Sequence, residues 1–156
     1  MSKLYELEMQ SIEGELVPFS KFRGQNLLIV NLASHCGLTS QYEGLCELHK
    51  QGVVHILGFP CNQFGNQEPG TDADILEFAK SKYNSNFPIF SKIEVNGEKT
   101  CKLYQWLKSE KADSGGNSDI SWNFTKFLVS KDGQVLARFD PATTPDEIRI
   151  KLDDFL

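Results

Sequence analysis

Cysteine is the residue type in this sequence best suited to chemistry, and it occurs at positions 36, 46, 61 and 101. Cys36 directly follows an apolar, partly β-branched segment (27–33) that predicts a buried strand, and it precedes an expected helix. A helix N-terminus presents unpaired N–H groups and the positive end of a dipole, which favour a thiolate over a thiol. Cys36 is therefore a candidate nucleophile, with a structural cysteine at a strand end as the alternative.

A second candidate segment, residues 59–70, is rich in side-chain amides and short of charge. It follows another expected buried strand (53–59), so it should lie beside Cys36 at the same edge of the sheet. Amides can donate hydrogen bonds to a developing oxyanion. A turn built from Asn, Gly and Pro is the alternative, but it does not explain Gln63 and Gln67.

A third candidate is Trp122-Asn123-Phe124, which stands just before an expected hairpin. The indole N–H can only donate a hydrogen bond, so it could serve an anion or a leaving oxygen. The alternative is a core tryptophan that closes the loop, which is the more common use of this residue.

The elements that must position these residues follow from periodicity. Strands 27–33 and 53–59 flank a helix that is expected to begin with a capping box, Ser40 to Glu43. Further patterns predict a helix at 72–83 capped by Thr71, and a helix around Leu103–Leu107 with Thr100 as its N-cap. A hairpin of 126–130 with 134–139 and a helix after Thr144 are expected to complete the chain. Strand–helix–strand followed by hairpin–helix is an α/β layout, the thioredoxin-like fold with a mixed central sheet flanked by helices.

Bulk composition narrows the class of protein. The 156 residues are 40% hydrophobic and 24% charged, which predicts one globular domain over 1–156. The net charge of -5 lacks the cationic footprint of a nucleic-acid binder. No signal-peptide pattern or membrane-spanning apolar run is found, so we expect a cytoplasmic protein with reduced thiols.

Three stretches together resemble the glutathione peroxidase family: residues 31–39 around Cys36, residues 59–70, and residues 122–128. The resemblance implies that Cys36 is the peroxidatic residue and that Gln67, Trp122 and Asn123 complete a catalytic tetrad. It implies reduction of hydrogen peroxide and of organic or lipid hydroperoxides through a Cys36 sulfenic acid. No bound cofactor or metal is expected; a thiol is the reducing cosubstrate.

The reductant is the point where the sequence departs from part of that family. Thioredoxin-dependent members carry a resolving cysteine in the helix after the second stretch, and the matching position here is Lys80. The expectation is therefore glutathione as an external thiol, although Leu38 stands where some glutathione-using relatives have a basic residue. The alternative is a thioredoxin-dependent cycle with Cys61 or Cys101 as resolving residue, while Cys46 is expected in the core.

Three other functions are alternatives to this one. Cys46 and His49 have ligand-like spacing for zinc, but the second half of a zinc motif is missing. A non-enzymatic binding or redox-sensing domain on the same fold is a further alternative. A thiol–disulfide oxidoreductase is disfavoured because the residue three after Cys36 is Thr39.

Substrate size and assembly follow from the resemblance. The segment 108–121 is short where tetrameric relatives carry an insertion, which implies a monomer with an open site that accepts phospholipid hydroperoxides. We also expect a transient contact with a lipid surface. Phe64 is expected either to help an acyl chain dock or to pack down onto the protein.

Overall fold

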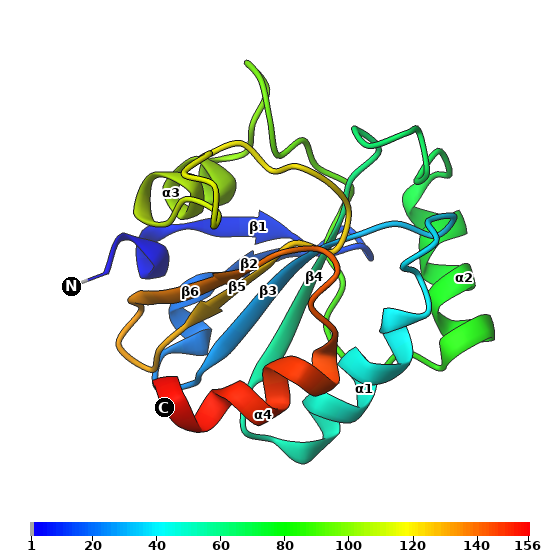
Figure 1. Ribbon diagram of the computed structural model, residues 1–156. Coiled ribbons are helices and arrows are strands. Elements are labelled where there is room, and N and C mark those ends of the chain that lie inside the picture. The colour runs from blue at the N-terminus through cyan, green and yellow to red at the C-terminus, as the bar shows by residue number, and fades with distance from the viewer. Residues whose placement is uncertain (1) are drawn as a thin grey trace.

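A mixed four-stranded sheet lies at the centre of the computed structural model, which describes residues 2–156 (Figure 1). Its strands are β3 (Leu27–Leu32), β4 (His55–Pro60), β5 (Lys126–Val129) and β6 (Val135–Phe139). The spatial order is β4-β3-β5-β6; β3 pairs parallel with β4 and antiparallel with β5, and β5 pairs antiparallel with β6. The predicted mixed sheet of a thioredoxin-like fold is thus confirmed.

Helices cover both faces of this sheet (Figure 1). One face carries α1 (Gln41–Gln51), α2 (Asp72–Tyr83) and α4 (Pro145–Phe155). The other face carries α3 (Lys102–Glu110), the 3-10 turns η1 (Lys3–Glu6) and η2 (Phe19–Phe22), and a small hairpin of β1 (Glu8–Gln10) with β2 (Leu16–Pro18). These N-terminal elements were not predicted, because strands of three residues are too short to show a clear alternation.

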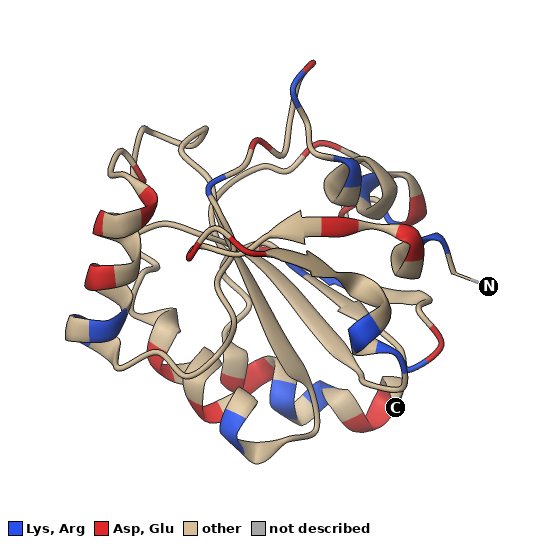
Figure 2. Ribbon diagram, turned by 180° about the vertical axis from the view of Figure 1, so that it is seen from behind, with Lys and Arg blue, Asp and Glu red and all other residues tan. Residues whose placement is uncertain are grey.

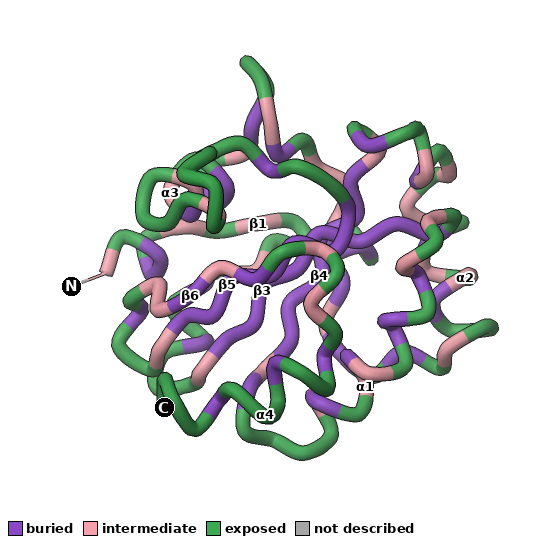
Figure 3. The backbone as a smooth tube through the Cα atoms, in the orientation of Figure 1, coloured by how far each residue is buried: buried purple, intermediate pink, exposed green. Residues whose placement is uncertain are grey.

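Strand β3 is buried on both faces, as its apolar sequence predicts (Figure 3). Leu28 and Val30 belong to a first hydrophobic cluster with side chains of α1, α2 and α4. Leu27 and Ile29 belong to a second cluster with side chains of α3, η1 and η2. Alternate residues of a strand point to opposite faces, so the sheet separates the two clusters.

Two of the predicted helix starts are confirmed in detail. Thr71 accepts the N–H of Asp74 and the Asp74 carboxylate accepts the N–H of Thr71, which forms a capping box at α2. Thr144 and Glu147 form the same arrangement at α4, with proline at the first helical position. Each box satisfies N–H groups that the helix leaves unpaired.

The predicted capping box at α1 is wrong. Ser40 makes no side-chain bond to the helix, and its backbone is already helical (φ -59°, ψ -16°). The preceding residues turn in the same sense, with the Tyr42 N–H donating to the Thr39 carbonyl oxygen at 3.0 Å. A capping side chain needs an extended backbone at its own residue, and this run of turns removes it.

The start of α3 also differs from the prediction. Its N-cap is Cys101, whereas Thr100 is buried and donates its hydroxyl to the carbonyl oxygen of Gly97. Cys101 is half-buried at the helix start.

Charge is distributed over the surface without large blocks. Figure 2 shows acidic and basic residues mixed along the helices. Among residues 2–156, no helix combines the length and the apolar composition needed to cross a lipid bilayer.

Candidate active site

The parallel strands β3 and β4 end at one edge of the sheet, and this edge brings two loops together. The Cys61 N–H donates to the Leu32 carbonyl oxygen at 3.1 Å where the strands finish. The segment after β3, residues 33–40, is called the Cys36 loop here, and the segment after β4, residues 61–70, the amide loop. Their juxtaposition follows from the parallel pairing that the sequence predicts.

Cys36 is half-buried and its backbone is fixed by Thr39. The Cys36 N–H donates to Thr39 Oγ1 at 3.0 Å, and that hydroxyl donates to the Ala33 carbonyl oxygen at 2.9 Å. The sulfur accepts the Leu38 N–H at 3.3 Å. Since α1 begins only at Gln41, the N–H group aimed at the sulfur belongs to the turn before the helix.

Gln67 is brought to the Cys36 loop by an unusual backbone. Gly65 and Asn66 both adopt left-handed conformations, with φ of 65° and 53°. A Cβ at Gly65 would lie 3.0 Å from the Trp122 ring, so the glycine also allows the close approach of that side chain. The Gln67 carbonyl oxygen accepts the N–H of His35 at 3.0 Å, which ties Gln67 to the residue before Cys36.

Asn123 and Trp122 complete this group. Asn123 is fully buried, and its Nδ2 donates to Gln67 Oε1 at 3.0 Å. Trp122 is 36% exposed, which excludes the alternative of a core tryptophan. Its ring packs on Phe64 with the centroids 5.9 Å apart, and Phe64 itself is buried. Phe64 has therefore packed down onto the protein and is not free to dock an acyl chain.

The structure thus brings Gln67, Trp122 and Asn123 together and anchors them beside the Cys36 loop. Among the described residues, the sulfur of Cys36 forms its hydrogen bond with Leu38 and none with those three side chains. The Oδ1 atom of Asn123 is buried and accepts no hydrogen bond from residues 2–156.

Asn31 supports this arrangement and was not predicted as a site residue. It is fully buried in β3, where its Nδ2 donates to the Trp122 carbonyl oxygen at 3.2 Å and its Oδ1 accepts the Thr125 N–H at 3.1 Å. Its own carbonyl oxygen accepts the N–H of Phe124, whose φ of 64° is left-handed. The available signal was a single polar residue inside an otherwise apolar strand.

The other three cysteines differ in their positions relative to Cys36. Cys61 and Cys101 lie in the second cluster, whereas Cys46 packs, like Cys36, against the first. Burial raises the pKa of the thiols of Cys46, Cys61 and Cys101. All four thiols are free in this structure.

The zinc alternative finds no support at Cys46 and His49. The Nδ1 atom of His49 accepts the N–H of Ile56 at 3.1 Å, so that ring is bound to β4. Across residues 2–156, no group of three or more His, Cys, Asp or Glu side chains is placed to hold a metal ion.

Comparison of the whole chain with known proteins identifies its family. Residues 4–108 match the protein-family model described as glutathione peroxidase. The chain belongs to this family and is a peroxidase, an oxidoreductase that reduces peroxides through cysteine.

The relatives span several kingdoms. The chain is 49% identical over 146 residues to a probable phospholipid hydroperoxide glutathione peroxidase 6, mitochondrial, of Arabidopsis thaliana, covering 91% of this chain and 62% of that longer relative. It is 44% identical over 160 residues to a glutathione peroxidase-like peroxiredoxin of Schizosaccharomyces pombe, with 100% of each chain covered.

Solved structures agree on the architecture. The crystal structure of T. cruzi GPX1 superposes with a TM-score of 0.75 at 33% identity, over 97% of this chain and 95% of that one. A thioredoxin family protein of Chlorobium tepidum, described as a thiol:disulfide interchange protein, superposes with a TM-score of 0.72 at 12% identity, over 99% and 95% of the chains. This second likeness shows the thioredoxin-like fold alone.

Proposed function

We propose that Cys36 is the peroxidatic residue and that Gln67, Trp122 and Asn123 serve it as hydrogen-bond donors and orienting groups. The observation that carries this proposal is the chain of contacts from Asn123 Nδ2 to Gln67 Oε1 and from the Gln67 carbonyl oxygen to the N–H of His35. Gln67 Oε1 accepts from Asn123, and the amide nitrogen of Gln67 bonds to no group within residues 2–156, so it can donate at the site.

The reaction starts from the thiolate of Cys36. The sulfur attacks one oxygen of the hydroperoxide, the O–O bond breaks, and the second oxygen leaves as an alkoxide or hydroxide. This oxygen takes up one proton and departs as alcohol or water, and the sulfur becomes a sulfenic acid. Donors such as the Gln67 amide and the Trp122 indole N–H stabilise the charge on the leaving oxygen.

A pair of serine variants tests the role of Cys36. Cys36→Ser is expected to lose peroxide turnover, whereas Cys46→Ser is the matched control because Cys46 packs against the same core cluster. Peroxide consumption with excess thiol is the measurement. Unchanged turnover in Cys36→Ser would overturn the assignment.

The reductant that we propose is a protein dithiol of the thioredoxin type. The name of the fission-yeast relative, a peroxiredoxin, supports this choice better than the glutathione expected from Lys80. The dithiol attacks the sulfenic sulfur, water leaves, and a mixed disulfide forms; its second thiol then releases reduced Cys36.

An internal disulfide is a separate question, since α2 (Asp72–Tyr83) contains no cysteine. Cys61 and Cys101 lie in the second cluster with raised pKa values, so pairing with Cys36 would require the sheet edge to rearrange. Two measurements separate an external reductant from an internal disulfide. The first compares turnover rates with thioredoxin and with glutathione, and the second is mass spectrometry after one equivalent of peroxide. Faster turnover with glutathione would refute the dithiol proposal.

The proposed substrates are hydrogen peroxide and organic or lipid hydroperoxides. The Arabidopsis relative is named for phospholipid hydroperoxides, and Trp122 leaves part of its ring exposed beside the site. Comparing rates on hydrogen peroxide and on a phosphatidylcholine hydroperoxide in vesicles tests this; no reaction with the lipid would refute it. A monomeric state, transient lipid-surface contact and cytoplasmic location remain predictions.

A further inference from the structure

Glu68 is a buried ionisable residue next to the Cys36 loop. It is 1% exposed, and its Oε1 accepts the N–H of Ser34 at 3.0 Å. The residue before it, Gln67, accepts the N–H of His35 through its carbonyl oxygen. Two successive residues of the amide loop therefore hold the two residues that precede Cys36.

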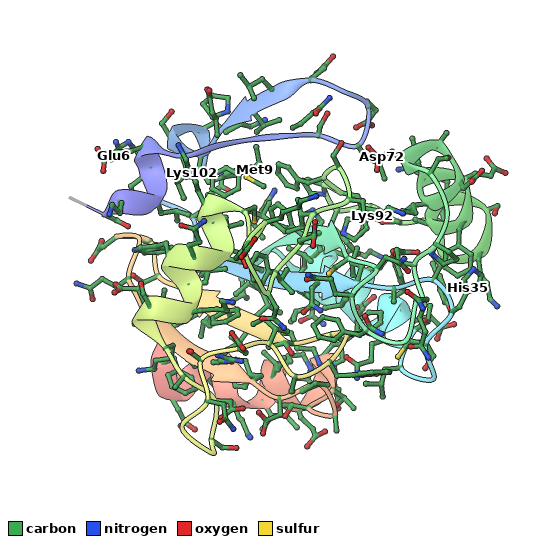
Figure 4. The ribbon with its side chains drawn as sticks, turned by 90° about the horizontal axis from the view of Figure 1, so that it is seen from above. Glu6, Met9, His35, Asp72, Lys92 and Lys102 are labelled. Atoms are coloured by element: carbon green, nitrogen blue, oxygen red, sulfur yellow. The ribbon has the colours of Figure 1, made fainter. Side chains whose placement is uncertain are left out.

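The carboxyl group of Glu68 makes no ion pair within residues 2–156. The charge of Lys92 acts on the Glu68 carboxyl group. However, Lys92 Nζ does not bond to that carboxyl group; it donates to the backbone carbonyl oxygens of Glu68 and Gly70. Figure 4 shows Lys92 and Asp72 on the same side of the molecule as His35. A negative charge on Glu68 is thus only partly balanced.

Three polar atoms of this region are buried and find no hydrogen-bond partner in the described part of the chain: Glu68 Oε2, Ser34 Oγ and Tyr42 Oη. Tyr42 lies in α1; burial raises its pKa, and the charge of Glu68 raises it further, so the two groups sense each other. Buried polar atoms normally find partners. A protonated carboxyl group can donate to a hydroxyl, and a carboxylate can accept from one. The side-chain contact of Ser34 that lowers the pKa of Glu68, and the effect of the Glu68 charge on Tyr42, place both residues near this carboxyl group.

Resting on the peroxidatic role proposed for Cys36, we propose that Glu68 is a positioning residue that holds or releases one proton beneath the Cys36 loop. With the hydroxyls of Ser34 and Tyr42, its carboxyl group makes the reaction of Cys36 with peroxide depend on pH. The bond from the Ser34 N–H keeps the loop in place in both states.

The electrostatics set the direction of this dependence. Burial raises the pKa of Glu68 to about 7, although contacts from Ser34 and the charge of Lys92 oppose part of that rise. Above this pH, Glu68 carries a negative charge beneath the Cys36 loop, which opposes the negative charge that develops on the leaving peroxide oxygen. Below it, Glu68 is neutral. The other titratable or charged groups around it are Lys92, Tyr42, Asp72 at the start of α2, and His35 on the loop.

The test is the rate at which hydrogen peroxide oxidises Cys36 in a single turnover without reductant, measured from pH 5 to 9 by loss of alkylation at Cys36. Glu68→Gln keeps the shape and an acceptor for the Ser34 N–H but cannot ionise. We expect the ratio of its rate to the wild-type rate to rise by about threefold between pH 6 and pH 8. The exposed Glu77 on α2 supplies the matched control, Glu77→Gln, whose ratio should stay constant.

A constant ratio in folded Glu68→Gln overturns the role of Glu68. If that variant does not fold, Ser34→Ala decides the question, because it removes a side-chain contact that lowers the pKa of Glu68. It should move the pH step upward by roughly half a unit, and an unmoved step overturns the proposal. Failure of wild-type Cys36 to react with peroxide would instead refute the proposed function itself.

Discussion

Replacing Asn31 by leucine should damage both stability and activity, because Asn31 connects the centre of the sheet to the Trp122–Asn123 segment. Leucine has nearly the same size but cannot form hydrogen bonds. Two bonds would be lost, from Asn31 Nδ2 to the Trp122 carbonyl oxygen and from the Thr125 N–H to Asn31 Oδ1. The backbone bond from Phe124 to Asn31 would remain.

The magnitude follows from what each lost bond leaves behind. The Trp122 carbonyl oxygen still accepts the Thr125 hydroxyl at 3.1 Å, so the loss of its bond from Asn31 Nδ2 costs little. The Thr125 N–H is buried and would have no acceptor, a penalty of about 1–3 kcal/mol. We expect the free energy of unfolding of Asn31→Leu to fall by about 2 kcal/mol, a large part of the 5–15 kcal/mol typical of a domain.

Urea unfolding followed by tryptophan fluorescence measures the first effect, and single-turnover oxidation of Cys36 measures the second. We expect the oxidation rate to fall by roughly tenfold, because a shift of the segment breaks the contact between Asn123 and Gln67. A change in unfolding free energy below about 0.5 kcal/mol, with an unaltered rate, would refute the reasoning.

Asn31→Asp is the informative control. One carboxylate oxygen can still accept the Thr125 N–H, but the other would face the Trp122 carbonyl oxygen, where the native amide donates. Burial and this repulsion should raise the pKa of the new carboxyl group. Its unfolding free energy should therefore increase as the pH is lowered through that raised value, since the protonated carboxyl group can donate to the carbonyl oxygen. The leucine variant should lack this pH dependence.

The remaining predictions address the loop, the sheet and a buried lysine. Thr39→Val should lower the unfolding free energy by about 1–2 kcal/mol and slow Cys36 oxidation, because the Cys36 N–H loses its acceptor; equal rates would contradict this. Gly58→Ala should lower the unfolding free energy by about 1–3 kcal/mol in a urea titration, because the alanine Cβ would lie 2.6 Å from Leu32 Cδ1. An unchanged unfolding midpoint would argue against tight packing around Gly58. Burial lowers the pKa of Lys126 from 10.5 to about 7, so the unfolded chain binds more protons above pH 7, and the unfolding free energy should rise by about 1.4 kcal/mol per pH unit between pH 8 and 9. Lys126→Met should abolish that slope, and a slope retained in this variant would assign it to another group.

The residues at strand ends could be predicted from the sequence, because their placement follows from topology. Two buried strands joined by a helix must run parallel, so the segments after them meet at one edge. This topology places the segment that contains Gln67 beside Cys36. Trp122 and Asn123 were placed by family resemblance, since nothing local in their segment indicates which edge it reaches.

The supporting residues could not be predicted, because their partners are distant in sequence. The Ser34 N–H bonds to Glu68 across 34 positions, and the Thr125 N–H bonds to Asn31 across 94. No local sequence pattern indicates such pairs. A polar residue inside an apolar strand, such as Asn31, can be recognised in the sequence, but its partner cannot. The capping box expected at Ser40 is an error in the other direction. The sequence motif is present, but the turns before the helix give Ser40 a helical backbone, so its side chain does not cap the helix.

The contacts divide the site into a framework and a reacting surface, and this division can be tested. Asn31 and Glu68 are buried and bond to backbone groups, so their replacement should change stability and rate together. Gln67 is half-buried and Trp122 is 36% exposed, so removing their free donors should change the rate with little cost in stability. Because Cys36 itself is held mainly through backbone bonds, its reactivity depends on the framework as much as on the donors. A plot of rate against stability for these variants should therefore separate into two groups.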